Sequence, residues 1–186
     1  MSSNINNICF PRWVDVINTF RLLWSQHVMW TRSFIVSSTP NRPDLDAVTN
    51  RLLRNPIDFA KVLKKYYGER KASTFEKLLR EHIEIAGQLL NAHKLKECKR
   101  IEKERRKWYN NADRISNFLS SINPFWSKRK WQEMFYRHLK MIECTMQDRI
   151  ARRYTAEIAM YQNIEREALH MADMMAVGII KQFRVK

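Results

Sequence analysis

Glycine, proline and cysteine are scarce in this chain, which has three glycines, five prolines and three cysteines among 186 residues. Strand-rich folds need many turn residues, so these low counts indicate long helices with few loops. The chain contains no Gly-rich phosphate loop, and no serine lies on a sharp nucleophile elbow. These absences exclude the usual nucleotide-binding motifs and the α/β-hydrolase motif.

The cysteines and the chain ends predict a cytoplasmic protein. Cys9, Cys98 and Cys144 are odd in number, widely spaced and without a CxxC pair, which argues against a disulfide scaffold or a cysteine-rich zinc site. The N-terminal residues lack a basic region followed by an apolar run, so we expect no signal peptide. The most apolar C-terminal stretch, 171–180, is too short to span a membrane.

Apolar residues recur at helical spacing along most of the chain, which suits one domain over 1–186 with a flexible start at 1–12. The spacing predicts helices at 13–37, 44–54, 55–67, 70 to about 92, 97–122, 128–149 and 154–183. The predicted fold is therefore all-α: an antiparallel bundle of four to five long helices, with a short helical insert after the first.

Several residues are suited to the ends of these helices. Asn55 is placed to cap a helix whose first turn holds Pro56, and Gly68 is placed to end that helix. We expect a turn near 93–96. Ser127 is placed to cap the predicted helix at 128–149.

Five predicted helices each carry one polar residue on the inward, apolar side: His27, His82, Asn111, His138 and Glu165. His27, for example, falls between Trp24 and Thr31 in "LLWSQHVMWTR". Short links make neighbouring helices antiparallel, so residues near helix midpoints tend to meet at similar heights. We therefore expect these polar groups to converge in the core.

Two arrangements satisfy such buried groups. One is a single zinc, iron or manganese ion, because imidazoles and a carboxylate suit these metals. The other is a metal-free hydrogen-bonded network in which Glu165 is ionised against a protonated imidazole. In the metal hypothesis the ligands are His27, His82, His138 and Glu165, and their outer hydrogen-bonding neighbours are Asn111, Asp113 and Asp173.

A carboxylate-bridged di-iron centre is disfavoured, because it needs a Glu-x-x-His motif on each of two helices. Only "EALH", 167–170, fits, and we expect it at the surface. A mononuclear histidine-rich site fits better, and its catalytic role stays open because no substrate cleft is visible in the sequence.

The formal net charge of +15 favours polyanionic partners such as nucleic acid or an acidic protein. The alternative function is therefore a non-enzymatic basic module with purely structural histidines. Its candidate contacts are Lys99, Arg100, Lys103, Arg105, Arg106, Lys107, Lys128, Arg129, Lys130, Arg152 and Arg153. Glutamates interleave with these lysines, which favours a solvated face instead. A third possibility is a homo-oligomer that uses Met171, Met174 and Met175.

Most of the chain, from about Leu22 to Phe183, resembles a family of short bacterial helical proteins whose function is not assigned. The matching phrases are "LWSQHVMWTR", "NRLLRNPIDFA", "EHIEIAGQLL", "WYNNADRISNFLSSINPFW" and "IEREALHMADMMAVGIIKQF". These phrases contain most of the inward polar set. Some members are automatically labelled acetylglutamate kinase, but this chain lacks the glycine-rich turns of such a kinase.

The chain departs from that family pattern in two places. Relatives usually have glycine after the "EHIEIAGQLL" helix, where this chain is lysine-rich. They also tend to carry glutamate where this chain has Arg137. The second change adds positive charge beside His138 and weakens the case for a cation there.

Overall fold

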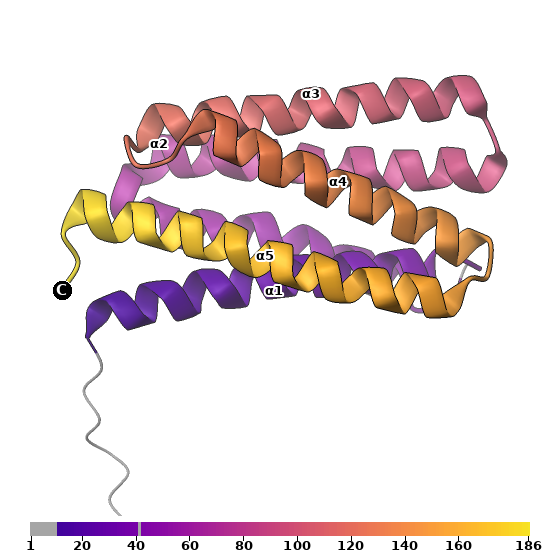
Figure 1. The fold of residues 1–186 in the computed structure, drawn as a ribbon, viewed down its shortest axis with the longest axis horizontal. Coiled ribbons are helices and arrows are strands. Elements are labelled where there is room, and N and C mark those ends of the chain that lie inside the picture. Colours follow the sequence, from indigo (N-terminus) through magenta and orange to yellow (C-terminus); the bar gives the residue numbers. More distant parts are fainter. Residues whose placement is uncertain (1–10, 41) are drawn as a thin grey trace, which may run out of the picture.

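The computed structural model describes residues 11–40 and 42–186, which form a helical bundle without strands (Figure 1). The elements are α1 (Arg12–Ser37), α2 (Leu45–Leu95), α3 (Cys98–Ile122), α4 (Lys128–Ile150) and α5 (Tyr154–Phe183). The all-α prediction is confirmed. Most of the segment predicted to be flexible, with Cys9, lies outside the described residues.

The long helix α2 reverses direction at Gly68, whose backbone is non-helical with φ 76° and ψ 171°. Phe59 and Phe75 have ring centroids 5.7 Å apart, whereas a straight helix would separate them by about 24 Å. α2 therefore consists of a first arm, 45–67, and a second arm, 69–95, that lie side by side. The predicted helix end at Gly68 is confirmed.

The predicted insert at 44–54 is wrong, because these residues belong to the first arm of α2 without a break. Pro56 lies inside the helix, and Asn55 is fully buried instead of capping a helix start. A proline inside a helix costs about 3 kcal/mol. Burial of Leu52 and Phe59 on the same arm offsets that cost.

The helices close into a ring around one core. α1 packs on α5, α5 on α4, and α4 on α3. Ring contacts place the first arm of α2 against α1, through Phe20 and Phe59, and the second arm against α3, through Phe75 and Phe118. This arrangement brings the middles of α1, α4 and both arms of α2 to a shared interior.

Short connections keep neighbouring helices antiparallel, as predicted (Figure 1). The turn after α2 centres on Lys96, which has a left-handed backbone. Ser127 caps α4 by accepting a hydrogen bond from the Lys130 amide at 3.4 Å. Both features match the sequence-based prediction.

The buried face of α5 includes two glutamates other than the predicted Glu165. Glu157 pairs with Arg32 at 2.7 Å, and Glu167 pairs with Arg137 at 3.0 Å. Both glutamates are buried, so the expectation that Glu167 lies at the surface is wrong.

The methionines of α5 belong to the core. Met171 and Met175 are fully buried, and Met174 is partly buried and packs against the core. The proposed methionine surface for self-association is therefore not available on this face. Among the described residues, no helix combines the length and apolarity needed to cross a bilayer.

Candidate functional site

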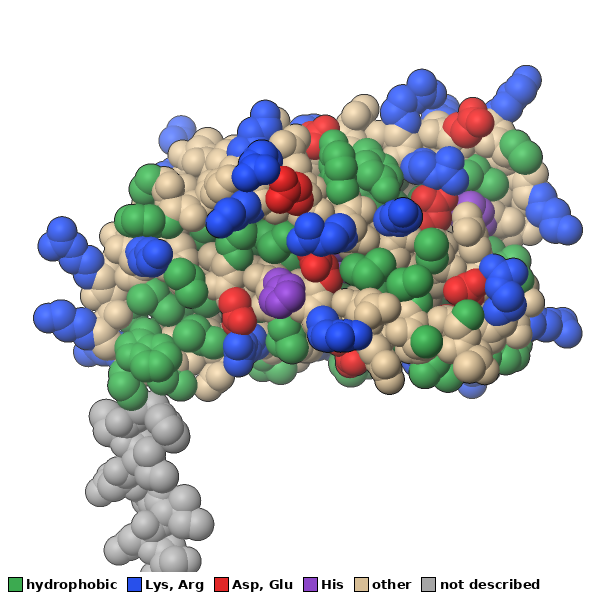
Figure 2. Space-filling model, viewed as in Figure 1, with side chains coloured by type: hydrophobic (Ala, Val, Ile, Leu, Met, Phe, Trp, Pro, Cys, Tyr) green, Lys and Arg blue, Asp and Glu red, His purple; other side chains and the backbone are tan. Residues whose placement is uncertain are grey.

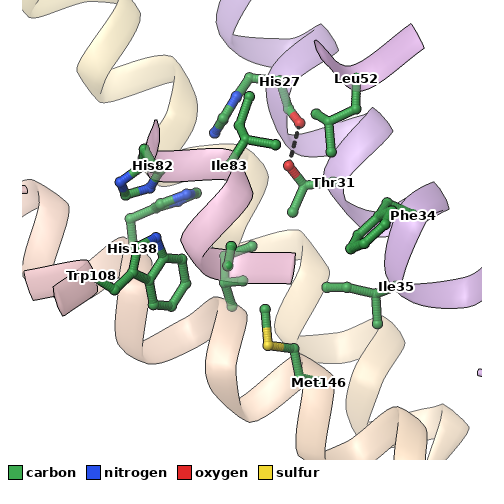
Figure 3. Close-up of a pocket in the computed structure, with 12 residues that line it drawn as sticks. His27, Thr31, Phe34, Ile35, Leu52, His82, Ile83, Trp108, His138 and Met146 are labelled. Atoms are coloured by element: carbon green, nitrogen blue, oxygen red, sulfur yellow. Dashed lines mark hydrogen bonds between the residues drawn. The ribbon is translucent and has the colours of Figure 1, made fainter. Parts of the chain in front are cut away.

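Three histidines meet inside the bundle, each from a different helical segment. His27 lies on α1, His82 on the second arm of α2, and His138 on α4 (Figure 3). The ring centroid of His27 is 5.9 Å from that of His138 and 6.4 Å from that of His82. All three side chains are at most 3 % exposed. The three imidazoles therefore converge in the core, as predicted. We call His27, His82 and His138 the histidine cluster.

Two asparagines orient two of the rings. His27 Nδ1 lies 3.2 Å from Asn55 Oδ1, and His82 Nδ1 lies 2.9 Å from Asn111 Oδ1. Each asparagine amide nitrogen donates to a main-chain carbonyl, that of Leu23 or Leu78, which fixes which end of the amide faces the ring. Because Oδ1 only accepts, each Nδ1 carries the proton. Both Nε2 atoms therefore have a free lone pair.

His138 differs from the other two rings. Its Nδ1 atom is buried and has no hydrogen-bond partner in the described part of the chain. The indole nitrogen of Trp108, whose ring lies 5.3 Å from that of His82, is in the same condition. Unpaired buried polar groups cost about 1–3 kcal/mol each, so this corner of the core holds polar groups that the protein itself does not satisfy.

The histidine cluster borders a small cavity of about 20 Å³. That space accommodates one water molecule or one ion. Besides the three imidazoles and Thr31, the residues that line it are apolar or aromatic and include Ile142 and Trp108. The Thr31 hydroxyl donates to the His27 carbonyl at 2.7 Å, so it is already engaged (Figure 3).

Burial keeps the imidazoles neutral. Desolvation lowers the pKa of His27 to about 4. Desolvation, with the neighbouring His27, lowers the pKa of His82 to about 3. Desolvation and both neighbouring rings also place the pKa of His138 well below 6.5. Neutral imidazole is the form that binds metals.

Glu165, the predicted carboxylate of the site, is exposed and lines a separate surface pocket beside Gln162 and Arg166. The prediction that it points inward is wrong. The metal-free network built on Glu165 and a protonated imidazole is wrong for the same reason. The network that exists joins neutral histidines to asparagines and main-chain carbonyls.

The two aspartates predicted as outer neighbours also bind elsewhere. Asp113 accepts hydrogen bonds from Gln132 at 2.8 Å and Tyr136 at 2.9 Å. Asp173 binds Arg21 through both carboxylate oxygens, at 2.7 and 2.9 Å. Of the predicted neighbours, only Asn111 contacts the histidine cluster.

Asn55 was missed as a site residue because its position before Pro56 suggested a helix cap. A usable signal was present: Asn55 lies three residues after Leu52 and four before Phe59, on the buried face of the same arm. Asn55 with His27 thus repeats the relation of Asn111 with His82.

The spacing of the rings can be compared with that of a metal centre. A tetrahedral zinc bound by imidazole nitrogens separates the ring centroids by about 5.2 Å. The observed separations of 5.9 and 6.4 Å exceed this by about 1 Å. Accordingly, no three His, Cys, Asp or Glu side chains within 11–40 and 42–186 already form a ligand set. A bound ion would have to draw the rings inward by a small movement.

The predicted polyanion contacts do not form one patch. Five of these cations are engaged: Arg100, Arg105, Lys107, Arg129 and Arg153 each pair with a nearby carboxylate. The others divide between the start of α4 and the opposite end of the bundle, separated by about 34 Å of helix. Figure 2 likewise shows blue cationic side chains scattered over the visible face, with red acidic ones among them.

Comparisons with known proteins add no relative: no family model, no curated protein and no solved structure matches the chain. The case for a function therefore depends on the geometry of the histidine cluster.

Proposed function

We propose that this protein binds a single metal ion through His27, His82 and His138. The observation that carries the proposal is the pair of asparagine-held imidazoles, each with its Nδ1 proton committed and its Nε2 lone pair free. Outer hydrogen bonds of this kind orient metal-binding histidines and raise their basicity.

Two further observations support metal binding. A buried neutral histidine needs a hydrogen-bond partner, yet His138 Nδ1 has none within the described chain. The cavity beside them has room for one ion. A metal also gives a reason for gathering three imidazoles at a place where hydrophobic side chains would pack at lower cost.

Arg137, the cation next to His138 in sequence, does not oppose this proposal. Its guanidinium binds Glu167 at 3.0 Å, so a carboxylate balances its charge. The side chain is also more than half exposed, where water screens it.

The test is a competitive zinc titration of untagged protein against a chelator, together with elemental analysis of protein as purified. We expect one metal equivalent per chain. His138→Leu should weaken binding by more than about 100-fold, because it removes a ligand and not only an outer partner. His170→Ala is the matched control, since His170 is exposed and lies outside the cluster.

The two variants separate the outcomes. Binding that survives in His138→Leu but falls in His170→Ala would place the metal on the surface and contradict the proposal. Failure of the wild-type protein to bind any first-row metal at one equivalent would contradict it as well.

A further inference from the structure

Within 11–40 and 42–186, no aspartate, glutamate or cysteine lines the cavity beside the histidine cluster, so this part of the chain brings no negative charge to it. Glu143, which follows His138 on α4, is held by Arg105 at 2.6 Å and His93 at 2.8 Å instead. Each imidazole supplies a lone pair without charge, so an ion in the cavity would keep its full formal charge.

Charge decides which ions tolerate such a place. The free energy needed to move an ion from water into a low-dielectric interior rises with the square of its charge, so a divalent ion costs about four times as much as a monovalent one. Divalent sites offset this cost with carboxylates or thiolates, or with a water that ionises in an open position. The described residues offer neither of the first two here.

The size of the cavity and the number of ligands also favour a monovalent ion over a divalent one. A cavity of about 20 Å³ holds the ion but leaves no room for several waters to spread its charge. Zinc needs a fourth ligand for its tetrahedral geometry. Cu⁺ has a filled d shell, accepts three ligands, and binds imidazole.

We propose that the ion preferred by this site is monovalent copper, Cu⁺, bound by three neutral imidazole nitrogens without an anionic ligand. This inference rests on the proposed metal-binding function and specifies its cargo. The chain's three cysteines and nine methionines are competing soft ligands, so the experiment must locate the copper on the histidines.

The experiment compares Cu⁺ with Zn²⁺ on the same untagged protein. Cu⁺ is generated with ascorbate without oxygen and titrated against bicinchoninate, and Zn²⁺ is titrated against a zinc chelator at the same pH. We expect one Cu⁺ per chain, an affinity for Zn²⁺ lower by at least about 100-fold, and loss of the tight Cu⁺ in His138→Leu but not in His170→Ala. On exposure to air, the bound copper should stay silent in electron paramagnetic resonance.

Each other outcome has a distinct meaning. Zn²⁺ that binds as tightly as Cu⁺, with both lost in His138→Leu, overturns the preference and leaves the metal site standing. Cu⁺ that survives in His138→Leu does not depend on the three-imidazole site and also overturns the preference. If neither ion binds in a manner that depends on His138, the proposed function itself fails.

Discussion

The Nδ1 atom of His82 lies 2.9 Å from Asn111 Oδ1, while the amide nitrogen of Asn111 donates to the Leu78 carbonyl at 3.1 Å. This chain of two hydrogen bonds fixes the ring to the backbone of its own helical arm. It leaves Nε2 as the only nitrogen of His82 that can bind anything else.

Removal of that asparagine should therefore affect both stability and metal binding. Asn111→Ala should lower the free energy of unfolding by about 1–3 kcal/mol, because it leaves a buried imidazole donor unpaired. It should also weaken metal binding by about 10–100-fold. Urea denaturation and chelator competition measure the two effects, with exposed Asn117→Ala as the control on the same helix. Unchanged metal affinity in Asn111→Ala would separate the asparagine from the site.

His138 distinguishes a functional histidine from a structural one. Because its Nδ1 has no hydrogen-bond partner in the described chain, the metal-free His138→Leu variant should be as stable as the wild type, or more stable by about 1 kcal/mol. Urea denaturation in the presence of a chelator checks this. A loss of more than about 2 kcal/mol would mean that the imidazole itself stabilises the fold.

The cluster also predicts a pH dependence of stability for the metal-free protein. The folded-state pKa values of His27, about 4, and His82, about 3, lie below the ordinary 6.5 because of burial. Between the folded-state pKa values and 6.5, the unfolded chain binds more protons than the folded one. The free energy of unfolding is therefore highest above pH 6.5 and falls as the pH decreases below it. Each buried histidine contributes up to about 1.4 kcal/mol per pH unit.

Glu143 acts in a lower pH window. Although burial acts to raise its pKa, hydrogen bonds from His93 and Arg105 lower it from 4.5 to about 2. Its stabilising contribution is therefore lost only as the pH falls through that range. Urea titrations at pH 7, 6 and 5 isolate the histidine effect, and His138→Leu should reduce the slope by about 1.4 kcal/mol per pH unit. A wild-type slope near zero would show that the imidazoles are hydrated.

Helical periodicity was enough to predict the histidine cluster. His27, His82 and His138 each have apolar residues three or four positions away, and the short links fix the heights at which antiparallel helices meet. Gly68 was equally predictable as a helix end, because glycine adopts a positive φ without strain. The structure has such a φ at Gly68.

Glu165 was mispredicted for a specific physical reason. The true inward stripe of α5 includes Glu157 and Glu167, whose charges are neutralised by arginines from α1 and α4. Hydropathy treats such glutamates as exposed, so an inward face chosen by apolar residues alone is rotated towards Ile158, which is 53 % exposed. Pairing between helices is not visible in a single sequence.

The contact between α5 and the α3–α4 connection gives a packing prediction. A Cβ atom on Gly178 would overlap the Trp126 ring, whose Nε1 donates to the Met174 carbonyl at 3.1 Å. Gly178→Ala should therefore lower the free energy of unfolding by about 1–3 kcal/mol through overpacking. Gly87→Ala is the control, because its Cβ would only touch Phe34 at 3.5 Å. Equal stabilities in thermal denaturation would contradict this packing.

The most direct measurement is anomalous X-ray diffraction from crystals of the metal-loaded protein, collected on both sides of the metal absorption edge. We expect one strong peak about 2.0–2.2 Å from a ring nitrogen of each of His27, His82 and His138, with the rings drawn together by about 1 Å. A strongest peak at His170 or Cys98 would contradict metal binding in the core. So would the absence of a core peak in loaded crystals whose rings keep their 5.9 and 6.4 Å separations.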